Sequence, residues 1–190
     1  MEHIGNLDYK LFYKDCFSNE NEYVEFYEKI KTCDNAPKMF HQTARIISLA
    51  DQLGGYIYDR PAINMLFYIM TAELVAKLYH NFNEDGQSKK YVKKFFVEFT
   101  SNNNKTILEN SIKKNNIFIS LDEVVEFFYK IRCDVVHEGN YYKYSFQSKN
   151  TSESSINIQL PKYEVIISIE DVRNIIIDSS INAIKMLISD

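Results

Sequence analysis

The spacing of apolar residues along the chain is mainly that of helices. Apolar side chains recur every three or four residues over 20–32, 38–53, 60–82 and 89–100, as expected for helices that bury one face. Gly54 and Gly55 are predicted to end the second of these helices. The segment 60–82 is apolar on nearly every side, which is typical of a helix surrounded by other helices. We therefore expect a helical bundle with 60–82 at its centre.

Two later helices carry clear start signals. Ser120 and Glu123 have the spacing of a capping box, and an apolar stripe continues from there until Gly139, which is placed to end the helix. Ser168 precedes a last segment whose apolar residues again cover one face. These signals predict a penultimate helix from Leu121 and a final helix after Ser168.

The stretch between these two helices has a different pattern. Apolar and polar residues alternate over 142–146 and again over 156–160, and a polar, loop-like stretch separates them. This pattern predicts a small β-hairpin inserted at about 141–168, before the last helix. Since we find no repeats or linker-like composition, we expect one domain over 1–190 with its core at about 37–189. The expected fold class is all-α, a bundle of four to five helices with this insertion.

Composition and charge narrow the function classes. The chain is 45% hydrophobic and has a formal net charge of −4, which argues against a protein that coats nucleic acid nonspecifically. Its three cysteines, Cys16, Cys33 and Cys133, form no C-x-x-C pair, so we expect neither a disulfide framework nor a zinc site. The four histidines show no metal-ligand spacing and the sequence has no Gly-rich phosphate loop, so we expect no metal and no cofactor. The N-terminus lacks the pattern of a signal peptide, and the most apolar window is interrupted at Glu73. We expect a cytoplasmic protein without a membrane segment.

The candidate chemistry lies in the segment KIRCDVVHEG, residues 130–139. Arg132 and His137 are five positions apart, which on a helix means about 140° of net rotation and about 7.5 Å of rise. The two can cooperate only if the helix ends or distorts near Val136, or if a second chain completes the site. A purely structural role is also open, because a protonated histidine favours a helix C-terminus. Asp134 is a candidate for orienting either residue.

Two other groups of polar residues are candidates for supporting roles. Glu73, Lys77 and His80 form one stripe, which is either a solvated face with an ion pair or part of a site. Between residues 87 and 120, seven lysines stand against two glutamates. This excess is either a solvated helix face or an RNA-backbone track, and the second interpretation requires the lysines to lie beside Arg132 and His137. The candidates for RNA binding are Lys89, Lys90, Lys93, Lys94, Lys113 and Lys114.

The R-x4-H motif formed by Arg132 and His137, late in a predicted helical bundle, resembles that of the HEPN superfamily of prokaryotic ribonucleases and nucleotide-binding domains. The resemblance implies metal-independent RNA cleavage, in which the ribose 2′-hydroxyl attacks the adjacent phosphate. Arg132 would stabilise the phosphate and His137 would transfer protons. It also implies a homodimer, because in-line displacement needs groups on both sides of the phosphorus and a two-fold axis supplies a second copy of both residues.

The resemblance leads to one expected function and leaves two alternatives. We expect an endoribonuclease that acts as a toxin or as an antiphage or abortive-infection component, with RNA as substrate and a protein antitoxin or regulator as a partner. The first alternative is a noncatalytic HEPN-like module that binds RNA, a nucleotide or a protein. Cys133 favours it, because active members of the family often carry Asn, Asp or His directly after the arginine. The second is a purely structural helical dimer, with the lysines turned away from the motif.

Overall fold

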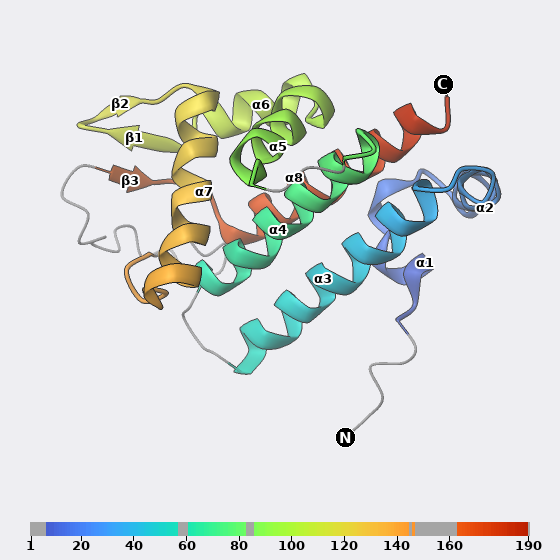
Figure 1. Cartoon of the computed structure of the whole chain (residues 1–190), viewed down its shortest axis with the longest axis horizontal. Helices are drawn as coiled ribbons and strands as arrows, with labels where there is room; N and C mark the ends of the chain where they lie inside the picture. Colours follow the sequence, from blue (N-terminus) through green and yellow to red (C-terminus); the bar gives the residue numbers. More distant parts are fainter. Residues whose placement is uncertain (1–6, 57–60, 83–85, 145, 147–162, 190) are drawn as a thin grey trace.

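The computed structural model describes residues 7–56, 61–82, 86–144, 146 and 163–189 (Figure 1). This part of the chain is mostly helical, with one small sheet, so the prediction of a predominantly helical fold is confirmed. The helices are α1 (Tyr9–Phe12), α2 (Glu20–Ile30), α3 (Ala36–Tyr56), α4 (Pro61–Tyr79), α5 (Ser88–Lys94), α6 (Asn102–Glu109), α7 (Leu121–Glu138) and α8 (Ile169–Leu187). A 3₁₀ turn, η1 (Lys14–Cys16), follows α1, and a π-helical turn, η2 (Phe95–Phe99), continues α5. The strands are β1 (Ile112–Lys114), β2 (Ile117–Phe118) and β3 (Tyr163–Val165).

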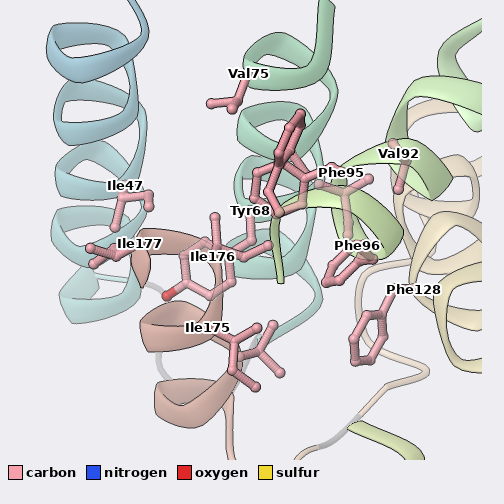
Figure 2. Packing of buried hydrophobic residues seen from close by; sticks show 14 of the residues in the cluster. Ile47, Tyr68, Val75, Val92, Phe95, Phe96, Phe128, Ile175, Ile176 and Ile177 are labelled. Atoms are coloured by element: carbon pink, nitrogen blue, oxygen red, sulfur yellow. The ribbon is translucent and has the colours of Figure 1, made fainter. Parts of the chain in front are cut away.

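Helix α4 occupies the centre of the bundle, as its apolar composition predicts. It packs against α3, α5, α7 and α8. Figure 2 shows side chains from several of these elements meeting in one cluster, among them Tyr68 of α4, Phe128 of α7 and Ile176 of α8. Among the described residues, α4 is also the one helix long and apolar enough to cross a membrane, and 44% of its apolar window is buried. Core helices of soluble proteins meet the same criterion.

The N-terminal segments contribute to the same buried core. Tyr13 is fully buried, its ring stacks on Phe40 of α3 with centroids 4.3 Å apart, and its hydroxyl donates a 2.6 Å hydrogen bond to the Phe40 carbonyl. Phe26 and Ile30 of α2 join the cluster as well. Buried side chains therefore begin well before residue 37.

The ends of α3 and α7 can be compared with the start and stop signals predicted from the sequence. Both bonds of the capping box are present at α7, since the Glu123 amide donates to Ser120 Oγ at 3.4 Å and the Ser120 amide donates to the Glu123 carboxylate at 3.1 Å. Gly139 follows α7 with φ of 64°, a left-handed conformation that glycine adopts readily. The predicted stop at Gly54 and Gly55 is wrong, because α3 runs through both to Tyr56. A glycine inside a helix costs only about 1 kcal/mol, so the other contacts of α3 can outweigh it.

The small sheet has the order β2-β1-β3, with both pairs antiparallel. The β1–β2 hairpin was not predicted. Its turn is Asn115–Asn116, with φ of 52° and 66°, a conformation that asparagine tolerates and that suits two-residue hairpins. Strand β3 falls in the predicted 141–168 insertion, but its partner is β1. Residues 145 and 147–162, where most of the predicted hairpin would lie, are outside the described residues.

Candidate functional site

Helix α7 remains one continuous helix through both motif residues. It runs without interruption from Leu121 to Glu138, so Val136 is helical and both motif residues lie on the same helix. Arg132 and His137 therefore project about 140° apart around the axis, with about 7.5 Å between them along it. A single copy of the chain does not bring the two side chains together, and only the route through a second chain is left for their cooperation.

Arg132 lies at the edge of the core. Its guanidinium carbon is 5.7 Å from the centre of the Tyr129 ring, a cation–π contact. Its Nε is buried and has no hydrogen-bond acceptor in the part of the chain that the structure describes. A buried donor without an acceptor costs about 1–3 kcal/mol. The hydrogen-bonding capacity of this donor is therefore unmet among the described residues.

His137 lies in the last turn of α7 and is exposed, as are its neighbours Val136 and Glu138. Within the described part of the chain, we see no hydrogen bond or ion pair of its ring. Glu138 instead interacts with Lys143 at 3.6 Å and with the Asn140 side chain at 2.5 Å. The imidazole is thus open to solvent and to a ligand.

Asp134 is engaged by residues other than the two motif residues. Both of its carboxylate oxygens accept hydrogen bonds from Lys130 Nζ at 2.8 Å, and the Tyr144 hydroxyl donates to Oδ2. Burial acts to raise the pKa of Asp134, but the bonds from Lys130 and Tyr144 outweigh it and hold the pKa below its ordinary value. Through the bond from Tyr144, Asp134 therefore holds the chain that follows α7 against the helix. The role predicted for it, orienting Arg132 or His137, does not match these contacts.

Glu73 connects two helices. Its carboxylate accepts from Lys77 Nζ at 2.6 Å, the predicted ion pair, and from Ser88 Oγ at 2.7 Å, where α5 begins. The third member of the predicted stripe, His80, has its own partner in η2, because its Nε2 lies 2.9 Å from the Glu98 carboxylate. Glu73 thus serves to hold α5 on α4, and the structure places it in no contact with Arg132 or His137 that would support the predicted site role.

The lysine excess counted along the sequence is largely offset in space. Carboxylates of α7, η2 and β3 lie within ion-pair distance of four of the candidate lysines, and the pairs are Lys89–Glu126 at 2.8 Å, Lys93–Asp122 at 2.7 Å, Lys94–Glu98 at 4.0 Å and Lys113–Glu164 at 3.3 Å. Lys90 donates to the Gln87 side chain at 2.9 Å. Lys114 lies over the Tyr163 ring, with Nζ 5.6 Å from its centre. These six lysines do not form an uninterrupted positive track.

A groove of about 500 Å³ runs along the outer face of α7 and was not predicted. Its floor includes Phe127 and Ile119, which are 6% and 8% exposed, and the Phe127 and Tyr163 rings are 5.1 Å apart. Figure 1 shows α7 between α5 on one side and the small sheet on the other. The described residues that line it are Lys89 from α5, Lys114 and Tyr163 from the sheet, Ile119, and Glu123, Glu126, Phe127, Tyr129, Lys130 and Cys133 from α7.

The groove points along α7 toward the histidine of the motif. Glu126, Lys130 and Cys133 recur at intervals of three and four residues, so they share one face of the helix. His137 follows Cys133 by four residues and lies on the same face, about 6 Å further along the axis. The sequence alone shows that these residues share a helix face. It does not show that residues of α5 and of the sheet lie beside that face and complete the groove.

The described residues offer no metal centre. They contain no group of three or more His, Cys, Asp or Glu side chains placed to hold a metal ion, and Cys16, Cys33 and Cys133 are free thiols. Comparison of the chain with protein-family models, with curated proteins and with solved structures found no match. The function must therefore be inferred from the residues and their geometry.

Proposed function

We propose that this protein is a homodimeric, metal-independent endoribonuclease with a HEPN-like helical bundle. The observation that carries the proposal is the C-terminal half of α7. There, Arg132 keeps a buried Nε donor without an acceptor among the described residues, and His137 stands exposed five residues later, about 1.4 turns along the helix. Arginine suits a phosphate group and histidine suits proton transfer near neutral pH. Because the two side chains diverge on one helix, the proposal requires two copies.

The reaction that these residues suit is transesterification. The ribose 2′-oxygen bonds to the adjacent phosphorus as the bond from phosphorus to the 5′-oxygen breaks. His137 of one copy takes the proton of the 2′-hydroxyl, and His137 of the other copy gives a proton to the leaving 5′-oxygen. Arg132 pairs with the phosphate oxygens as negative charge builds up on them. The products are a 2′,3′-cyclic phosphate and a 5′-hydroxyl.

Exposed apolar side chains around the motif support a contact between two copies. Val136, between the two motif residues in sequence, is 49% exposed, and Tyr141 and Tyr142, just beyond α7, are 40% and 67% exposed. A two-fold contact that covers these side chains would bury the same residues from both copies and place both motifs at one axis.

We further propose that the enzyme acts in the cytoplasm as a toxin or as an antiphage or abortive-infection component, under the control of a protein antitoxin or regulator. This setting follows from the resemblance of the R-x4-H motif to the HEPN superfamily. Its test is co-expression with the products of neighbouring genes. A product that relieves growth arrest and copurifies with the chain would be the expected partner.

The decisive experiment is inducible expression of the wild-type chain, Arg132→Ala and His137→Ala, with growth and total RNA followed in each culture. Arg45→Ala is a matched control, because Arg45 is an exposed arginine on α3. We expect wild type and the control to arrest growth and fragment RNA, and both motif variants to do neither. Fragments should end in a cyclic phosphate. Intact RNA with the purified wild-type dimer, together with identical growth of all four cultures, would overturn the proposal.

One observation favours a second candidate, a noncatalytic module that binds RNA, a nucleotide or a protein. Arg132 is half-buried against Tyr129 and is followed by Cys133, and in one copy it points away from His137. Under this function, purified chain binds its ligand and leaves RNA intact, and Arg132→Ala weakens binding without any change in RNA.

A further inference from the structure

The groove along α7 combines features that recognise an unpaired nucleotide. Two half-exposed tyrosines, Tyr129 and Tyr163, border an apolar floor formed by Phe127 and Ile119. Aromatic side chains bind unpaired bases by stacking, whereas the bases of a duplex are already stacked on one another. The volume of about 500 Å³ makes this a substantial groove at the surface of the protein.

The charges at the rim favour a phosphate at one side of the groove. Lys114 has no carboxylate within ion-pair distance among the described residues, and its ammonium lies over Tyr163 at 5.6 Å. Lys130, on the α7 side, shares its charge with Asp134, and its side chain is 59% exposed. Lys89 is paired with Glu126. The available positive charge is therefore greatest beside Tyr163.

The position of the groove links it to the motif. Cys133 lines the groove, and His137 lies on the same face of α7 one turn further on. A strand of nucleotides that enters the groove can therefore continue toward His137 without crossing to another face of the helix.

We propose that this groove is the binding site for single-stranded RNA next to the cleavage centre, with a base against Tyr163 and its phosphate on Lys114. This inference rests on the proposed function in that it assigns the substrate of the same site. The preference for a single strand and the residues that confer it go beyond the motif.

The test uses the full-length chain carrying His137→Ala, so that bound RNA is not cut. Binding is measured by fluorescence anisotropy with a short labelled single strand of uridines or adenosines, and with the same strand annealed to its complement. Lys114→Gln and Tyr163→Leu are added separately. The matched controls are Lys38→Gln, an exposed lysine on α3, and Tyr23→Leu, a half-buried tyrosine on α2, at the opposite end of the molecule (Figure 1).

We expect single strands to bind more tightly than the duplex. Tyr163→Leu should weaken single-strand binding roughly tenfold, as for the loss of one stacked base. Lys114→Gln should weaken it severalfold and lower the slope of log Kd against log salt by about 0.7, as for the loss of one phosphate contact. Because Lys114 is exposed, its variant tests the groove even if Tyr163→Leu fails to fold, which a thermal melt followed by circular dichroism would reveal.

RNA binding by the groove variants tests the groove, whereas RNA cleavage by the wild-type chain tests the proposed function, so the two can fail separately. Groove variants that bind like their controls, equal affinity for duplex and single strand, or no binding of either probe would overturn the groove assignment, even if the wild-type chain cleaves RNA. Weakened binding in both groove variants would support it, even if the wild-type chain leaves RNA intact and the catalytic proposal falls.

Discussion

The two ends of α7 differ in how their polar groups are used. At the N-terminal end, Ser120 and Glu123 cap each other, and Glu126 accepts from Lys89, so side chains close to the helix satisfy the polar groups. At the C-terminal end, Arg132 keeps a buried Nε without an acceptor among the described residues, and His137 is exposed. The N-terminal end is thus internally neutralised. The C-terminal end carries groups that a ligand could engage.

Among substitutions in α7, the largest loss of stability is expected on the buried side of the helix. Phe128 is fully buried, and its ring centre lies 6.2 Å from that of Phe96. Phe128→Ala should lower the free energy of unfolding by about 3–5 kcal/mol, because it removes buried apolar surface and leaves a cavity. Urea titration followed by circular dichroism measures this loss.

His137→Ala provides the contrast at the exposed end, and its free energy of unfolding should stay within about 0.5 kcal/mol of the wild-type value. A large loss in this variant would mean that the histidine supports the fold. A small loss in Phe128→Ala would contradict the position of that side chain in the core.

A second, intermediate effect is expected at Asp134. Asp134→Asn should cost about 1–3 kcal/mol, since it weakens the buried interactions with Lys130 and Tyr144. The pKa of Asp134 in the folded state lies below its ordinary value of 3.8. A carboxyl group with a lowered pKa stabilises the fold fully above its ordinary value, and this contribution is lost as the pH falls through the lower, folded-state value.

Denaturant titrations at several pH values test this dependence. The difference in stability between wild type and Asp134→Asn should be constant around neutral pH and should shrink below pH 3.8. Tyr144→Phe is the matched control, because it removes one hydrogen bond and keeps the carboxylate and Lys130. A difference that grows toward low pH would contradict the assignment of these contacts.

The smallest of these effects on stability is expected at the N-terminal end of α7. Ser120→Ala removes the acceptor for the Glu123 amide and should cost about 1 kcal/mol. Ser120→Asp, which keeps an acceptor at the cap, should recover most of this stability. Chemical denaturation of the three chains measures both, and equal stability of Ser120→Ala and wild type would show that the box contributes nothing to α7.

Local signals in the sequence predicted the parts of the fold that local contacts determine. The two partners of the Ser120 capping box lie within one turn, and Gly139 has the left-handed conformation expected at a helix end. The β1–β2 hairpin was missed although Asn115–Asn116 is a typical two-residue turn. There, two of the three residues of the first strand are lysines, so charge dominates the pattern and an apolar alternation is not evident.

The candidate site was predicted less completely because its contacts join distant parts of the chain. Glu126 neutralises Lys89 from 37 positions away, and Tyr144 bonds to Asp134 across the end of α7. Lys114 and Tyr163 reach the groove only because β1 pairs with β3. No spacing rule links these residues, whereas the pattern that marks Arg132 and His137 is entirely local.

The π-helical turn η2 makes the chain sensitive to length at one place. Phe95, Phe96 and Phe99 all point into the core from this turn, and Glu98 reaches His80. Deletion of one residue here would return the segment to α-helical register and rotate the residues after it by about 100°. Phe99 and Glu98 could not both keep their partners after such a rotation. Related sequences should therefore show conservative apolar exchanges at 95, 96 and 99 but neither insertions nor deletions within 95–99.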